Sequence, residues 1–102
     1  MAVTIPKTIK VGKRRYSIEV VETMLQRRAM GTINHDAQRI TIGCRSNVTG
    51  TRYSQAMMQD TFWHELVHAI LNDMGEHTLN TNEKFVAGFA NRLTKAIKSA
   101  RF

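Results

Sequence analysis

The chain has 102 residues, a length typical of a single domain that buries a modest hydrophobic core. Hydrophobic residues make up 42% of it, which is ordinary for a soluble globular protein and too high for a disordered tail. The net charge of +7 suggests a nucleic-acid partner, but lysine and arginine are dispersed along the chain, which is more typical of a solvated surface.

Three further features bear on where the protein acts. No apolar run approaches the length that crosses a membrane. The N-terminal stretch MAVTIPKTIKVGKRRY lacks the long apolar segment of a signal peptide. Cys44 is the only cysteine, so no internal disulfide can form. Together these features predict a cytoplasmic protein without a membrane partner, and they leave its oligomeric state open.

The first half of the chain has the two-residue period of β-strands. Four strands are predicted in two hairpins: 9–11, 16–20, 31–34 and 39–42. The turns of these hairpins are expected at 12–14 and 35–38. The segment 22–30 fits either a loop or a helical turn, and 43–51 (GCRSNVTGT) is predicted to be a loop.

The second half has the period of α-helices. Two apolar stripes recur every four residues: Phe62, Leu66, Ile70 and Met74, then Phe85, Phe89, Leu93 and Ile97. The first helix is expected to begin near Ser54 and to be capped by Gly75, and the second to begin near Thr81 or Asn82. We expect the stripes to pack on each other and on the sheet. Residues 1–102 are thus predicted to form one α+β domain, a small antiparallel or mixed sheet followed by two packed helices.

The stretch TFWHELVHAILNDMG, residues 61–75, carries a metal-binding pattern. His64 and His68 are one helical turn apart, about 5–6 Å at Cβ, so both imidazoles can reach one ion at about 2.0–2.1 Å. Glu65 is rotated by about 100° from His64, which places it close enough to hold a water that the ion binds. This is the HExxH motif, two metal ligands and a general base on one helix.

The motif predicts hydrolysis with zinc as cofactor. Zinc lowers the pKa of its bound water toward about 7 and polarises the scissile carbonyl, while Glu65 accepts a proton and could pass it to a leaving amine. The alternative is that a basic chain with four histidines acquired this spacing by chance. Chance is disfavoured because the apolar stripe of the helix leaves both histidines on a different face.

A catalytic zinc needs a third protein ligand. Glu83 is the first choice, because it opens the second helix, which folds back against the first. Glu83 could instead be stabilised by the helix dipole or pair with Asn80 in a capping box. His77, in the connecting loop, is the rival ligand; it could also bind substrate, donate a proton or be an ordinary loop histidine.

Three other residues are weighed against simpler roles. His35, in a predicted hairpin turn, is expected to be solvated. Cys44 could occupy the open zinc position, but a small half-buried residue is the better interpretation. Asp73 could orient a ligand, although a surface carboxylate is favoured.

HELVHAIL followed by NEKFVAGFAN resembles the gluzincin metallopeptidases, in which a glutamate at the start of the next helix is the third zinc ligand. The chain looks most similar to the short phage- or prophage-encoded ImmA/IrrE-like zincins, whose hairpins precede the active-site helix. The resemblance implies zinc on His64, His68 and Glu83, with Glu65 as the base, in a minimal zincin-like domain. It also implies a peptide substrate along an edge strand, and action in the cytoplasm of a bacterial host.

Two hypotheses follow. The first is a small zinc metalloendopeptidase; large gluzincins have a further subdomain that often stabilises the oxyanion, and Arg92, His77 and Tyr53 are the candidates for that role here. The second is a catalytically weak or inactive zincin-fold protein that binds an acidic host protein or nucleic acid through its basic surface. Activity retained in Glu65→Gln would exclude the first mechanism. A salt-dependent complex that survives this substitution would favour the second.

Overall fold

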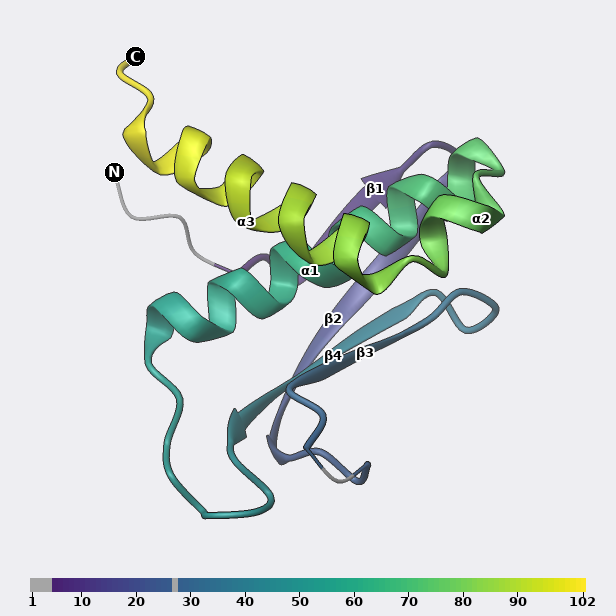
Figure 1. The fold of residues 1–102 in the computed structure, drawn as a ribbon. Coiled ribbons are helices and arrows are strands. Elements are labelled where there is room, and N and C mark those ends of the chain that lie inside the picture. The colour runs from purple at the N-terminus through teal and green to yellow at the C-terminus, as the bar shows by residue number, and fades with distance from the viewer. Residues whose placement is uncertain (1–4, 27) are drawn as a thin grey trace.

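A small mixed sheet and a layer of helices make up the structure, a computed structural model that describes residues 5–26 and 28–102 (Figure 1). The elements in chain order are β1 (Thr8–Val11), β2 (Arg14–Thr23), β3 (Gly31–Asn34), β4 (Arg39–Arg45), α1 (Gln55–Met74), α2 (His77–Asn80) and α3 (Glu83–Ser99). This arrangement confirms the predicted α+β class. Residues 1–4, on which part of the prediction against a signal peptide rests, lie outside the described residues, as does Arg27.

Both predicted hairpins are present in a four-stranded sheet of order β1-β2-β4-β3. β1 pairs with β2, and β3 with β4, in antiparallel fashion. β2 and β4 run parallel, with Val20 opposite Ile42. Because β4 pairs with both β2 and β3, it lies between them. The edges of the sheet are therefore β1 and β3. The face away from the helices is polar and carries an exposed ion pair between Arg39 and Glu19 at 3.7 Å.

α1 covers the other face of the sheet, and the main core lies between them (Figure 1). Tyr16, Ile40 and Ile42 of the sheet pack against Phe62 and Leu66 of α1, and all five side chains are buried. Burial of each such side chain contributes roughly 1.5–3 kcal/mol. The core therefore fixes α1, and with it the HExxH motif, against the sheet.

α1 begins and ends where the sequence predicts. The Ser54 hydroxyl accepts a hydrogen bond from the Met57 N–H at 3.1 Å, and Gly75 ends the helix with a left-handed φ of 74°. The chain then forms α2, a single turn that the sequence did not predict. Asn82 caps α3 by accepting from the Phe85 N–H at 3.1 Å. In the described part of the chain, none of these helices is long and apolar enough to cross a membrane.

The predictions for two irregular segments are revised. The segment 43–51 does not start as a loop, because β4 continues to Arg45. The Gly43 N–H donates to the carbonyl of Met30, the residue just before β3, at 2.9 Å, which keeps β4 paired past the start of β3. In 22–30, β2 continues to Thr23 and the rest of the described residues form no helix, which favours the loop.

The apolar stripe predicted for α3 is not the one that the helix buries. Val86, Ala90 and Thr94 face inward, at most 3% exposed, whereas Phe89 is 50% exposed and Ile97 37%. Glu83 provides the reason. It shares a helix face with Val86 and Ala90, at spacings of three and seven residues, so a helix that turns Glu83 toward α1 turns those residues inward too.

The stripe predicted for α1 is only half correct. Phe62 and Leu66 are buried, but Ile70 and Met74 are exposed. The second half of α1 instead packs sideways against α3, through Val67 and other residues of a second, smaller core cluster.

Candidate metal centre

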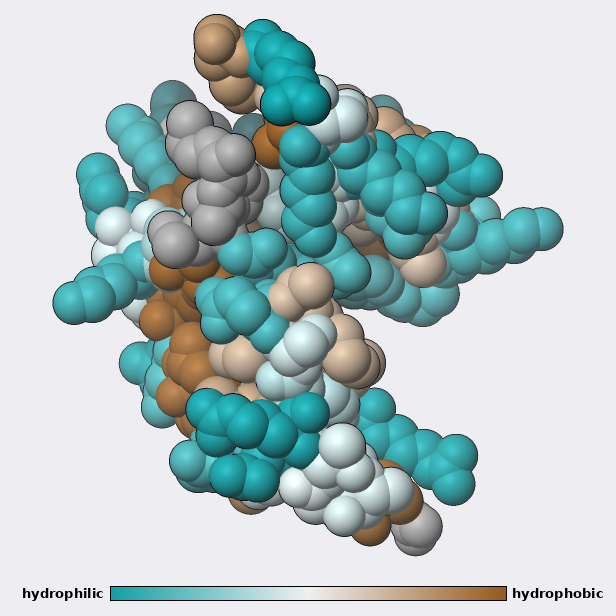
Figure 2. Space-filling view, turned by 90° about the vertical axis from the view of Figure 1, so that its left-hand side faces the viewer, coloured by the Kyte–Doolittle hydropathy of each residue, from teal (hydrophilic) through white to brown (hydrophobic). Residues whose placement is uncertain are grey.

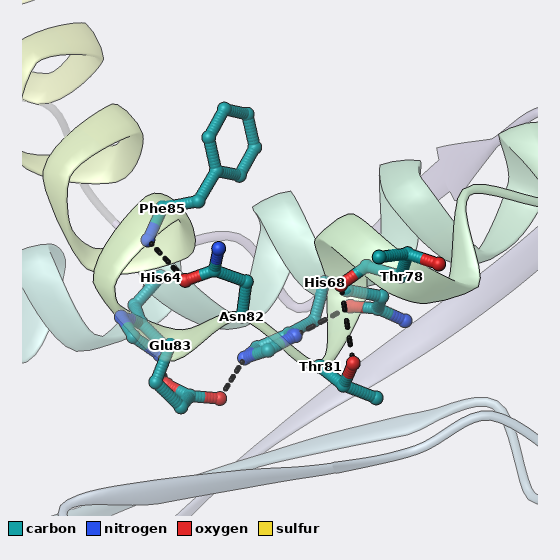
Figure 3. Close-up of polar contacts among 8 residues, drawn as sticks. His64, His68, Thr78, Thr81, Asn82, Glu83 and Phe85 are labelled. Atoms are coloured by element: carbon teal, nitrogen blue, oxygen red, sulfur yellow. Dashed lines mark hydrogen bonds and ion pairs between the residues drawn. The ribbon is translucent and has the colours of Figure 1, made fainter.

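Three side chains converge where α1 passes the start of α3 (Figure 3). His64 and His68 lie on the same side of α1, with ring centroids 5.1 Å apart. Glu83 is the first residue of α3, and its carboxylate reaches both rings. Its Oε2 is 3.2 Å from Nε2 of His64, and its Oε1 is 3.1 Å from Nε2 of His68. One ligand atom from each residue lies within 4.8 Å of the others, so the group could hold a metal ion.

The polarity of the contacting atoms fits a cation between them. His68 donates its Nδ1–H to the side-chain oxygen of Asn80 at 2.6 Å, so in the neutral ring Nε2 carries a lone pair. In that form the lone pair faces a carboxylate oxygen of Glu83 at 3.1 Å, and two acceptors at this distance repel unless a proton or a metal cation lies between them. Ligand atoms about 2.1 Å from a tetrahedral ion are themselves roughly 3.4 Å apart. Two histidines and a carboxylate suit zinc and also other divalent ions.

Asn80 is the site residue whose role the sequence did not reveal. The suggested capping box with Glu83 is wrong, because Asn82 caps α3. Asn80 instead accepts from His68, which fixes the tautomer and orientation of that ring. It reaches the ring because it ends α2, after which Thr81 turns the chain into α3. No local pattern in the sequence signals such a contact between a helix end and a neighbouring helix.

Glu65 lies beside the three ligand candidates and is only 7% exposed. Burial raises the pKa of its carboxyl group to about 7; the charge of His68 opposes this rise, and that of Glu83 adds to it. Gly31, at the start of β3, contributes to the enclosure. A Cβ added at Gly31 would lie 2.5 Å from Cγ2 of Thr61 and 3.6 Å from Cγ of Glu65. The absence of a side chain at Gly31 thus lets β3 pass directly over the acid.

A groove with a cavity volume of about 690 Å³ runs along α1 to these residues. Its two walls are α1 with Glu83, and the segment 28–31 that leads into β3. The groove is lined by Arg28, Ala29, Met30, Gly31, Met57, Asp60, Thr61, His64, Glu65, His68 and Glu83. Figure 2 shows the molecule hollowed on one side, between its upper and lower parts. Sites for small ligands have volumes of this order, about 300–1,000 Å³.

Other residues singled out in the sequence lie away from this group. His77, Arg92 and Tyr53, the candidates for stabilising an oxyanion, do not line the groove. Cys44 is half-buried in β4 and does not belong to the ligand group. Asp73 is exposed and packs against the turn of the first hairpin, so the surface role is the correct one.

His35 is not solvated as expected. It is half-buried in the turn between β3 and β4, where its Nδ1 lies 3.2 Å from the hydroxyl of Tyr16 and the two rings meet edge to face at 6.4 Å. Burial lowers the pKa of His35, and the charges of His68 and Arg14 lower it further against an opposite effect of Asp36.

The chain matches no protein-family model, no curated protein and no solved structure. The case for a function therefore depends on the geometry of His64, Glu65, His68 and Glu83.

Proposed function

We propose that the chain is a zinc-dependent metallopeptidase of the gluzincin type, similar to the short ImmA/IrrE-like zincins. The observation that carries this proposal is the convergence of Nε2 of His64 and of His68 on the two oxygens of Glu83. Glu65, buried on the adjoining face of the same helix, supplies a carboxylate that is not needed as a ligand. The combination of three ligands and a separate base is what distinguishes a hydrolytic site from a structural one.

The roles of the residues follow from their positions. Zinc held at this centre would polarise the scissile carbonyl and lower the pKa of the attacking water. Glu65 orients that water, takes its proton during attack and delivers the proton to the leaving amine. His64, His68 and Glu83 would hold the ion, and the hydrogen bond from Nδ1 of His68 to Asn80 would orient Nε2 of that ring toward it.

We propose a peptide or protein as the substrate. The groove passes the edge strand β3, where an extended peptide can add a strand and bring a backbone carbonyl to the group formed by His64, His68 and Glu83, beside Glu65. A cytoplasmic location, in a bacterial host if the chain is phage-encoded, belongs to the same proposal and comes from the family resemblance.

Metal analysis combined with a cleavage assay tests the proposal. We expect about one zinc per chain in the wild type and in Glu65→Gln, and much less in Glu83→Ala. Of these three proteins, only the wild type should cleave a peptide library. Glu76→Ala removes an exposed carboxylate at the start of α2 and is the matched control, which should retain both metal and activity. A wild type that cannot be loaded with metal, or a Glu65→Gln variant that still cleaves, would contradict the proposal.

A further inference from the structure

The outer face of α3 is apolar where a surface helix is normally polar. The helix turns its smaller residues toward α1, and Phe89 remains 50% exposed on the opposite side. The ring of Phe85 stacks on that of Phe89, with centroids 5.8 Å apart and planes at 26°. Ile97 continues the stripe toward the C-terminal end of α3 and is 37% exposed. Phe85 is partly buried against the second core cluster, whereas Phe89 and Ile97 are left largely outside it.

The two rings line a second groove, with a cavity volume of about 410 Å³. It is lined by Asn82, Lys84, Phe85, Gly88, Phe89 and Arg92. The Arg92 guanidinium lies over Gly88, where it donates to the Gly88 carbonyl at 3.1 Å and would lie 3.1 Å from an added Cβ. In Figure 3 Phe85 points away from Glu83, so this groove and the metal centre lie on different sides of α3.

The charges around the second groove are all positive. Lys84 and Arg92 line it, and neither belongs to an ion pair within residues 5–26 and 28–102. Glu83 is the sole acidic residue of α3, and its carboxylate faces the histidines instead. An apolar stripe with a uniformly basic margin is complementary to an apolar stripe with an acidic margin.

We propose that this face of α3 is the docking site for an amphipathic, acidic helix of a partner protein. Phe85, Phe89 and Ile97 lie on the four-residue ridge with which helices interdigitate. Their side chains would insert between apolar residues of the partner helix. Carboxylates on the margin of that helix would then pair with Lys84 and Arg92. Docking requires neither the metal nor Glu65, so it is independent of the proposed peptidase activity.

Two other occupants fit the surface less well. A second copy of the chain would bring Lys84 and Arg92 of both copies together, and like charges at an interface oppose association. Single-stranded nucleic acid stacks its bases on free aromatic faces along a basic track. Here Phe85 and Phe89 cover each other, and two cations line the groove.

Selection of helical peptides against the intact protein tests the proposal. The library randomises both the apolar stripe and the flanking positions of the helix. We expect the enriched peptides to carry apolar residues at helical spacing with aspartate and glutamate on the flanks. The best of them should bind Phe89→Ala and Arg92→Glu with roughly tenfold or more loss of affinity. Lys13→Glu makes the same type of charge change in the turn between β1 and β2 and should leave binding unchanged.

Glu65→Gln and wild type should bind the selected peptide equally, which separates this test from that of the peptidase. Enriched peptides with basic or unbiased flanks would overturn the proposal, as would binding that survives both Phe89→Ala and Arg92→Glu. A homodimer in sedimentation that Phe89→Ala dissociates would assign the face to a second copy. Oligothymidylate that binds more tightly than any peptide and is lost in Phe89→Ala would assign it to nucleic acid.

Discussion

Glu65 carries a carboxyl group that is buried beside Gly31, and its pKa is raised to about 7 from an ordinary value of 4.5. The metal-free folded chain therefore binds this proton more tightly than the unfolded chain does. The resulting stabilisation is fully present below about pH 4.5 and is lost as the pH rises through about 7, with a total on the order of 3 kcal/mol. Glutamine has no carboxyl group to titrate, so metal-free Glu65→Gln should not lose this stabilisation as the pH rises. Its free energy of unfolding should therefore increase relative to that of the wild type between about pH 4.5 and 7.

Urea unfolding of both proteins at a series of pH values, with a chelator present, measures this difference. The other titratable groups are present in both proteins, so the difference between the two free energies of unfolding reports Glu65 together with its electrostatic coupling to His68 and Glu83. A difference that stays constant from pH 4.5 to 7 would show that Glu65 is solvated.

Asn80 contacts His68, one of the candidate metal ligands, and accepts its Nδ1–H at 2.6 Å. Asn80→Ala should lower zinc affinity about 10- to 100-fold, because the ring loses the partner that fixes its tautomer. Asn80→Asp keeps an acceptor and should recover much of the affinity. Competition with a chromophoric chelator measures both values. Asn91→Ala, which removes an exposed amide from α3, should bind zinc as the wild type does.

At the scale of elements, the two faces of α3 should respond differently to truncation. Val86 is fully buried against α1, so Val86→Ala should lower the free energy of unfolding by about 2 kcal/mol. Phe89 is half exposed, so Phe89→Ala should cost less than about 1 kcal/mol although it removes more atoms. Urea denaturation measures both costs, and the reverse order would mean that Phe89 belongs to the core.

The contact between β3 and α1 depends on the missing side chain at Gly31. Gly31→Ala places a Cβ 2.5 Å from Cγ2 of Thr61, which forces strand and helix apart and should cost about 1–3 kcal/mol. Thr61→Ser removes the clashing methyl group and keeps the hydroxyl. The double variant should therefore be more stable than Gly31→Ala in thermal melts, and equal stability would place the clash elsewhere.

At the scale of the whole molecule, metal should strengthen the attachment of α3 to α1. These helices pack together through a small core cluster that includes Val67 and Val86. An ion bound by His64, His68 and Glu83 would add a second connection between them. At a zinc concentration 100-fold above Kd, the folded state gains about 2.7 kcal/mol. The melting temperature should then rise by roughly 10 °C or more and fall again with chelator. Calorimetry of Glu83→Ala should show little of this rise, and an equal rise would remove Glu83 from the ligand set.

Much of the fold could be predicted because its signals are local. Ser54 and Gly75 mark the ends of α1 through contacts within a few residues, and both hairpins pair neighbouring segments. The pairing of His64 with His68 is also local, since one helical turn separates them. The insertion of β4 between β2 and β3 could not be predicted in this way, because it joins strands that are distant along the chain.

The sequence by itself determined the order of the elements and which residues α1 offers to a metal. Tertiary structure decided what faces them: Asn80 meets His68, Gly31 covers Glu65, and α3 turns Phe89 outward. Hydrophobicity alone favours burying the phenylalanines. A helix has one inward face, however, and the residue that reaches the histidines, Glu83, shares that face with the small side chains that allow α3 to lie close against α1.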